Sequence, residues 1–252
     1  MLPLERRRRI LDLLKSRGTM RTSEIASELK VSNSTARRDL EELSERGQID
    51  RSHGAAAPKL RDLAPEPPFD QKVGSRRGEK DRIAAAAAKL VPDGSTLIFD
   101  SGTTLLALAR RLAGRPVTCI TLDLPVAQVL AQGETEVWMV GGRVRNGLYS
   151  VVGPWGEEVL KSSRADIFFM GADAVDQEVV SNSTVEEATM KQLGIRGAQE
   201  TILLADHTKF GRRSMAVVCG LQEVDLLIAD DKLAELGIMQ HLNGKLLRIE
   251  VA

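Results

Sequence analysis

The sequence predicts an α/β protein in two parts: a small N-terminal domain of helices with a short hairpin, and a larger domain with a mostly parallel sheet. Aromatic residues make up only 3% of the 252 residues and hydrophobic residues 42%, so the core must consist of Ala, Val, Leu and Ile. That composition suits helices packed on a sheet. The N-terminal part has helical periodicity, whereas the later part alternates helices with short apolar strands. A proline-rich stretch lies between them, so we expect domains at residues 1–57 and 81–252 and a linker at 58–80.

The net charge is zero but unevenly distributed. Residues 1–61 carry 14 Lys and Arg against nine Asp and Glu, a balance of +5, and the remainder carries −5. This suggests that only the first domain meets a polyanion, although such a balance also arises by chance. The N-terminus has no signal-peptide core and no apolar run reaches membrane length, so we expect a cytoplasmic protein with no membrane partner. Cys119 and Cys219 lie in apolar, strand-like runs and are expected to be buried free thiols, and no Cys/His spacing suggests a metal.

The first domain is predicted to contain three helices, a strand and a turn. Thr22 and Ser32 precede the second and third helices, where a hydroxyl can accept hydrogen bonds from the free amides of the first turn. Ala36, Leu40 and Leu43 are spaced four and three apart, which predicts one buried stripe on the third helix. Together these elements predict three helices with a β-wing. The helices span residues 4–15, 23–29 and 33–46, the strand 48–52, and the turn 53–54.

The exposed start of the third helix is suited to DNA. Two short helices joined by a tight turn are typical of a helix-turn-helix, whose second helix enters the major groove by its N-terminal residues. Asn, Ser, Thr and Arg side chains at that position can reach base edges and phosphates. The alternative is a small helical dimerisation domain with solvated arginines. Arg37 and Arg38 point about 100° apart, so they cannot read the same base, and one could contact phosphate or pair with Asp39 or Glu41.

The second domain is predicted to alternate strands and helices. This alternation favours an α/β layered fold with a mostly parallel sheet, in which ligands bind beyond the carboxyl ends of the strands. The predicted strands are residues 95–99, 117–121, 137–140, 167–170, 201–204 and 226–229, and the predicted helices are 83–91, 104–112, 125–131, 157–161, 185–192 and 232–238.

Polar loops follow four of these strands. Residues 100–104 open a helix with small hydroxyls, a glycine and free amides, which together form an anion cradle, although an ordinary helix cap uses the same residue types. Gly141 and Gly142 allow either close approach of the backbone to a ligand or a tight turn. Asp173 could bind sugar hydroxyls, act as an acid or base, or cap a helix. Lys209 is a candidate phosphate partner.

Glu186, Glu187 and Lys191 share one predicted helix. Glu187 and Lys191 are four residues apart, so a surface ion pair is the default interpretation.

The run VSNSTARRDLEELSERGQIDRSHGAA resembles the DeoR family of winged helix-turn-helix regulators. It matches the family's Ser-x-x-Thr, Arg-Arg-Asp-Leu and Arg-x-His-Gly pattern, with Ala55 in place of a usual second glycine. The segments EKDRIA, IFDSGTT, MVGGRVR, FFMGAD, EEATMK and LLADHTKFG resemble the family's effector domain, which is related to ribose-5-phosphate isomerase-type sugar-phosphate folds. The resemblance therefore covers nearly the whole chain. It implies a phosphate site at residues 101–104, with Asp173, Lys191 and Lys209 near the ligand and Asp100, Gly141 and Gly142 lining it.

The chain departs from the family pattern on the side that would read the sugar. Leu122 replaces an amide that could hydrogen-bond a sugar, and Asp123 adds a negative charge. Ala174 replaces a glycine, and residues 181–184 read Ser-Asn-Ser-Thr. The phosphate cradle is retained, so we expect a phosphorylated effector whose remaining part differs from a typical sugar phosphate.

The leading hypothesis is a repressor of carbohydrate-metabolism genes that a phosphorylated metabolite releases from a double-stranded DNA operator, working as a homo-oligomer, either dimer or tetramer. One alternative is a sugar-phosphate isomerase-like enzyme with an attached DNA module, using Asp173 and Glu186 as acid and base. Another is a constitutive DNA-binding protein. We expect no enzyme activity, cofactor or metal. The candidate DNA-binding residues are Thr22, Ser32, Asn33, Ser34, Thr35, Arg37, Arg38, Arg51 and His53. The candidate effector-binding residues are Asp100, Ser101, Gly102, Thr103, Thr104, Gly141, Gly142, Asp173, Glu186, Lys191 and Lys209.

Overall fold

The computed structural model of the chain divides into two compact units, Met1–Ala64 with Leu236–Ile238 and Pro65–Glu235 with Met239–Ala252. It describes residues 3–17, 20–45, 49–52, 54–58, 66–236, 242 and 248–252. No helix among these residues is long and apolar enough to cross a membrane.

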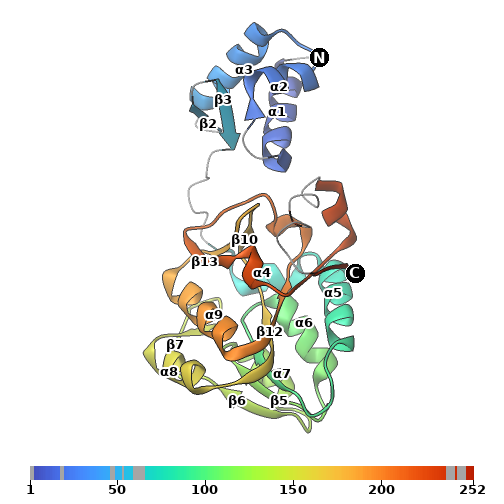
Figure 1. Ribbon diagram of the computed structural model, residues 1–252, viewed down its shortest axis with the longest axis vertical. Helices are drawn as coiled ribbons and strands as arrows, with labels where there is room; N and C mark the ends of the chain where they lie inside the picture. The colour runs from blue at the N-terminus through green and yellow to red at the C-terminus, as the bar shows by residue number, and fades with distance from the viewer. Residues whose placement is uncertain are drawn as a thin grey trace. The chain divides into compact units, whose positions relative to one another are not determined.

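The first unit contains three helices and a small sheet (Figure 1). The helices are α1 (Pro3–Arg17), α2 (Thr22–Glu28) and α3 (Asn33–Glu45), and the strands are β1 (Met20–Arg21), β2 (Ile49–Ser52) and β3 (Ala55–Pro58). The strands pair antiparallel in the order β1-β3-β2. The predicted elements are therefore confirmed to within two residues at their described ends. The core consists of Ile10, Leu14, Met20, Ile25, Leu29, Leu40, Leu43, Ile49 and Ala56.

A buried ion pair joins α1 to α3. Arg6 donates to both oxygens of Asp39, with the longer contact at 3.1 Å, and Asp39 is only 4% exposed. Arg7 forms a second ion pair with Glu42. Asp39 is thus bound by α1 and not by Arg37 or Arg38, because it lies on the buried side of α3.

The second unit is built on a seven-stranded, wholly parallel sheet in the order β15-β14-β12-β9-β4-β5-β6 (Figure 1). Its five inner strands bury apolar residues on both faces, as expected for a parallel sheet covered by helices, whereas the edge strands are more exposed. The strands are β4 (Thr96–Phe99), β5 (Thr118–Thr121), β6 (Glu136–Met139), β9 (Ala165–Met170), β12 (Ala198–Leu204), β14 (Leu226–Ala229) and β15 (Arg248–Val251).

Helices cover both faces of this sheet. On one face α5 (Arg77–Lys89), α6 (Thr103–Leu112) and α7 (Leu124–Leu130) pack over Leu97, Phe99 and Phe169. On the other face α8 (Pro154–Ser162) packs against α9 (Val185–Gly197), which lies on β9 and β12. A Cβ built on Gly194 of α9 would lie 2.7 Å from the ring of Phe168, so glycine is needed for this close approach.

The segment predicted as a linker is largely part of the folded second unit, so this prediction is wrong for residues 69–80. Phe69 begins a short helix, α4 (Phe69–Gly74), and is buried in the core, and α5 already starts at Arg77. Pro68 precedes α4 and so removes no helical hydrogen bond, because a proline at a helix start gives up only an amide that has no partner there. Residues 59–65 lie outside the described residues.

A second, three-stranded antiparallel sheet was not predicted from sequence. It consists of β10 (Ala174–Val175), β11 (Val179–Asn182) and β13 (Ala216–Gly220), in that order. Two further short strands, β7 (Arg143–Val144) and β8 (Val151–Val152), pair with each other. The helix predicted at 232–238 is instead a 3-10 turn, Asp231–Leu236, as far as it is described. Both cysteines are buried free thiols, as predicted.

Candidate DNA-binding surface and effector site

The predicted DNA face of the first unit is exposed. Asn33, Ser34, Arg37 and Arg38 are exposed at the start of α3, and Thr35 is half-buried. In the described part of the chain, neither Arg37 nor Arg38 has a side-chain hydrogen bond or ion pair. Both guanidinium groups are therefore available to an anionic partner.

Ser32 and Thr22 have local structural roles. The hydroxyl of Ser32 accepts a hydrogen bond from the amide of Thr35 at 3.2 Å, which confirms it as the cap of α3. Thr22 was predicted to cap α2, but the helix already starts at Thr22, and the Glu24 carboxylate accepts from the amide of Arg21 instead. The amide and hydroxyl of Thr22 both donate to the carbonyl of Gly54, so Thr22 ties α2 to the wing hairpin.

Arg51 and His53 are the two candidate DNA-binding residues of the wing. Arg51 lies on β2 opposite Ala56, but its side chain is outside the described residues, as is the whole of His53.

In the second unit the predicted anion cradle is the start of α6, directly after β4. Gly102 precedes the helix with φ 125° and ψ 168°, a conformation that favours glycine. No side chain caps the helix, and a Cβ built on Gly102 would meet no atom within 4 Å. The helix start therefore has no side-chain cap, and the space beside Gly102 is open, next to Ser101 and Thr103 in sequence; uncapped first-turn amides of this kind can bind an anion. Thr104 is buried.

A buried ion pair positions this loop. Lys191 on α9 binds the carboxylate of Asp100 and donates to the carbonyl of Gly171 at 3.1 Å. The same carboxylate accepts from the amide of Gly171 at 2.8 Å. Lys191 is 2% exposed and Asp100 is 1% exposed. Burial lowers the pKa of Lys191, but the carboxylates of Asp100, Glu187 and Asp173 together raise it above its ordinary value, so the ammonium stays charged. The pair ties together the loops that follow β4 and β9.

Asp173 and Lys209 lie at the ends of the neighbouring strands β9 and β12. Asp173 accepts from the amide of Ser183 at 2.9 Å. Burial raises the pKa of Asp173, but the Lys209 charge and Ser183 lower it more. In the described residues the ammonium of Lys209 has no hydrogen bond or ion pair, and its burial lowers its pKa. A half-buried lysine without a direct partner is a candidate for binding an anion.

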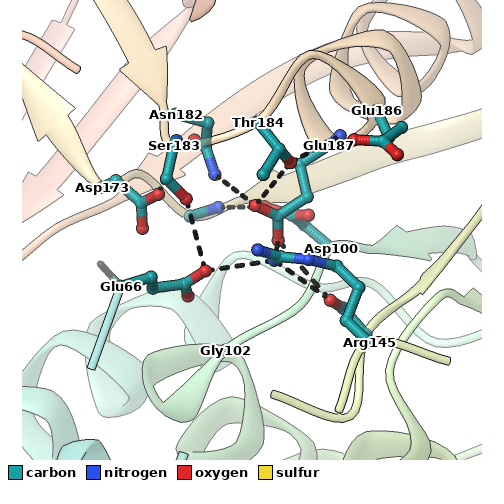
Figure 2. Close-up of polar contacts among 12 residues, drawn as sticks. Glu66, Asp100, Gly102, Arg145, Asp173, Asn182, Ser183, Thr184, Glu186 and Glu187 are labelled. Atoms are coloured by element: carbon teal, nitrogen blue, oxygen red, sulfur yellow. Dashed lines mark hydrogen bonds and ion pairs between the residues drawn. The ribbon is translucent and has the colours of Figure 1, made fainter. Parts of the chain in front are cut away.

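A cluster of charged side chains adjoins Asp173 (Figure 2). The carboxylate oxygens of Glu66, Asp173 and Glu187 lie within 4.8 Å of one another. Arg145 pairs with Glu187 and, at 3.0 Å, with Glu66, and Lys72 pairs with Glu66. Such a carboxylate group could in principle hold a cation, but Arg145 and Lys72 already supply positive charge to it. Burial, together with the Glu66 charge, raises the pKa of Glu187 to about 7.

Glu186 and Glu187 exchange the roles expected for them. Glu186 was predicted in the effector site, but its side chain is 54% exposed and pairs with Arg143 at 3.0 Å. Its neighbour Glu187, predicted as a surface partner of Lys191, is only 5% exposed and faces Asp173. Adjacent helical residues point about 100° apart, so only one of the two can face the site.

The paired glycines after β6 serve packing. Gly142 has φ 144°, and a Cβ built on it would lie 2.5 Å from the carbonyl oxygen of Val152 on β8. Gly141 lies against Trp155, at 3.7 Å from a built Cβ. The tight-turn interpretation explains Gly142 without a ligand.

Asp123 does not face an open site, although sequence reasoning placed it on the sugar-reading side. It is fully buried, caps α7 by accepting from the amide of Val126 at 3.0 Å, and accepts from the amide of Gly102 at 3.0 Å. Burial, with the nearby Asp100 charge, raises its pKa to about 7. Asp123 therefore fixes the Gly102 amide at the start of the cradle.

Sequence reasoning missed several charged residues near the site, chiefly Glu66, Lys72, Lys80 and Arg145. Lys80 is 7% exposed and donates to the carbonyl of Ser75 at 2.8 Å, and burial lowers its pKa to about 8. Three of the four belong to the segment interpreted as linker and helix start, where a charged residue is normally solvated. No local pattern distinguishes these residues, because distant segments bring them together.

Comparison with known proteins gives matches over both units. The family model described as "DeoR-like helix-turn-helix domain" matches residues 6–59, and the one described as "DeoR C terminal sensor domain" matches residues 75–231. The HTH-type transcriptional regulator GlpR of Haloferax volcanii is 34% identical over 235 residues, 92% of each chain. The lactose phosphotransferase system repressor of Staphylococcus aureus is 35% identical over 229 residues, 90% of this chain and 91% of that protein. Among solved structures, ribose 5-phosphate isomerase A from Methanocaldococcus jannaschii matches with a TM-score of 0.41 and 22% identity, over 54% of this chain and 55% of that one.

Proposed function

Because this chain belongs to the DeoR family of DNA-binding transcriptional regulators, we propose that it is a repressor whose effector is a phosphorylated sugar or related metabolite. The two family matches confirm the resemblance to the DeoR family seen in the sequence. The relatives named above are regulators, which favours this function over the isomerase-like alternative. The S. aureus relative is named as a repressor, and this supports the repressor assignment here.

The observation that carries the effector proposal is the pairing of an uncapped helix start with an unpartnered lysine. No side chain caps α6 at Gly102, where a built Cβ meets no atom within 4 Å, and Lys209 on a neighbouring loop has no partner in the described residues. A phosphate monoester carries up to two negative charges and several acceptor oxygens, and it would be bound by both groups. Asp173 and the buried Glu187 then face the remainder of the ligand, where carboxylates accept hydrogen bonds from hydroxyl groups.

On the DNA side, the start of α3 would enter the major groove. Asn33, Ser34 and Thr35 would reach base edges, and Arg37 or Arg38 would contact phosphate. Thr22 and Ser32 would act by holding the two helices and the wing in place, as their hydrogen bonds indicate. The protein would act in the cytoplasm, on an operator of double-stranded DNA.

We also propose that the chain works as a homo-oligomer held by its second unit. Large apolar side chains are exposed there: Trp155 and Val159, one turn apart on α8, are 76% and 41% exposed, and Trp138 on the edge strand β6 is 59% exposed. Exposed apolar side chains in such numbers are typical of protein interfaces. Two heads on one oligomer would read two half-sites one helical turn apart, and effector binding would favour an arrangement that no longer fits them. Light scattering on the purified protein measures the state directly, and a monomer at micromolar concentration would contradict this assembly.

The experiment that tests the proposed function is fluorescence anisotropy of the full-length protein on DNA from upstream of its own gene, at fixed salt, against scrambled competitor. We expect selective binding, reversed by a subset of phosphorylated sugars. Sequence-independent binding at every salt concentration, together with turnover of a sugar phosphate, would support the isomerase-like alternative.

The same assay tests the DNA face. Replacing Arg38 with Ala should weaken binding to all sequences and lower the slope of log affinity against log salt by about one. Arg9→Ala on α1 is the control, because it removes the same charge from an exposed site away from α3. Equal effects of both substitutions would show that only net charge matters and that α3 is not the reading helix.

A further inference from the structure

Glu66 lies at the start of the second unit, directly after residues 59–65. Its carboxylate is enclosed within that unit. Its side chain is 10% exposed. It pairs with Lys72 of α4. It also pairs with Arg145 at 3.0 Å and accepts from the hydroxyl of Ser183 at 3.4 Å (Figure 2). A carboxylate near the start of a folded unit is ordinarily solvated, so the enclosure of Glu66 by these three charged or polar side chains indicates a specific role.

The segment that carries Glu66 is fastened to the sensor unit at more than one point. The amide of Phe69 donates to the carbonyl of Gly147 at 2.8 Å, and the Phe69 ring meets Tyr149 edge-on, with centroids 5.4 Å apart. Arg145 lies in the same loop as Gly147 and Tyr149. The Glu66 contact is therefore the ionic part of a larger attachment of α4 to the loop between β7 and β8.

Glu66 borders the proposed effector site. Its carboxylate oxygen lies within 4.8 Å of those of Asp173 and Glu187. Its partner Lys72 acts electrostatically on Lys209 and on Asp123, which binds the Gly102 amide at the cradle. Glu66 thus neutralises the positive charge of Lys72 and Arg145 beside the carboxylates of the proposed effector site.

We propose that Glu66 is a residue of the effector site, where its carboxylate competes with the anionic part of the effector for Lys72 and Arg145. The inference rests on the proposed effector function. In the empty sensor Glu66 supplies the negative charge, and in the occupied sensor the ligand supplies it, so Glu66 moves away from Lys72. The competing view is that Glu66 is a purely structural ion-pair partner with no effect on ligand affinity.

The test is the affinity of the full-length protein for inorganic phosphate, measured by titration calorimetry at constant ionic strength. Glu66→Gln keeps the shape and removes the charge. We expect it to bind phosphate about tenfold more tightly than the unsubstituted protein, the effect of removing one negative charge from near the ligand. Asp70→Asn is the matched control, since Asp70 is an exposed carboxylate four residues further along the chain, on α4, and the affinity of this variant for phosphate should be unchanged.

A second substitution makes the test independent of how well Glu66→Gln folds. Lys72→Met removes the cation for which carboxylate and phosphate compete, and it should weaken phosphate binding about tenfold while Glu66 keeps Arg145. Unchanged affinity in both variants, with phosphate still binding the unsubstituted protein, would overturn the role of Glu66 but leave the proposed function standing. Weaker binding in Glu66→Gln would also overturn it, because Glu66 would then be a direct ligand contact. Absence of phosphate binding in every variant would remove the proposed effector function and this inference with it.

Discussion

The buried pair of Asp100 and Lys191 offers a quantitative test of how the effector site is held. Lys191→Met keeps the length and apolar stem of the side chain but removes the ammonium. Asp100 would then retain the Gly171 amide, at 2.8 Å, as its partner and lose its ion pair with Lys191, while the Lys191 position loses its bond to the Gly171 carbonyl. The loops after β4 and β9 would no longer share a common anchor.

The size of the effect follows from burial. The two side chains are 1% and 3% exposed, so water cannot replace the lost partner. Breaking a buried pair by removing one member costs about 3–5 kcal/mol, since an uncompensated charge stays in the interior. Replacing both members, as Asp100→Asn with Lys191→Met, removes the stranded charge. The double variant should therefore be more stable than Lys191→Met alone, by about 2 kcal/mol or more.

Urea unfolding followed by fluorescence and circular dichroism measures these free energies. Both tryptophans, Trp138 and Trp155, belong to the second unit, so their fluorescence reports on the unit that is perturbed. Lys161→Met is the control, because Lys161 forms an exposed pair with Glu158, and its unfolding midpoint should not change. A cost below about 1 kcal/mol for Lys191→Met, or a double variant no more stable than it, would refute the reasoning.

Three further predictions concern the same unit. Gly194→Ala should destabilise it by about 1–3 kcal/mol, because the new Cβ would lie 2.7 Å from the fully buried Phe168 ring. The control is Gly197→Ala on the same helix, whose Cβ would meet nothing nearer than 3.4 Å and which should be nearly neutral. Equal thermal midpoints for the two variants would contradict the packing argument. Thr103→Val should retain DNA binding in the anisotropy assay yet lose release by the effector, and unchanged release would remove Thr103 from the cradle. The pKa of Asp123 is raised to about 7, so the folded state favours the neutral carboxyl. The contribution of Asp123 to the free energy of unfolding should therefore fall by about a few kcal/mol as pH rises from about 4 through about 7. Asp123→Asn should flatten that part of the stability–pH curve, and an identical curve would show that Asp123 does not titrate there.

Local sequence was sufficient wherever a pattern repeats within one element. The stripe of Ala36, Leu40 and Leu43 predicted α3, and Ser32 was recognised as its cap because a cap bonds to amides only two or three residues away. Six of the seven strands of the parallel sheet were predicted, because strands buried on both faces are apolar along most of their length. The edge strand β15 was not predicted, since Arg248–Val251 is only partly apolar and partly buried. The cradle at the start of α6 was recognised for the same reason, since the loop and the helix that form it are contiguous.

Tertiary structure alone decided which charged residues meet. Asp39 is bound by Arg6, from 33 residues away, and Lys191 by Asp100, from 91 residues away, although in each case nearer partners of opposite charge were available. Glu187 faces the site and Glu186 faces solvent because of the angle at which α9 lies on the sheet, which the α9 sequence cannot show. The residues around Glu66 come from α4, the β7–β8 loop, the residue that follows β11, and α9, so their meeting depends on the order of the strands. Periodicity reports which side of an element is buried, whereas the identity of the neighbour across that surface depends on packing between elements distant in sequence.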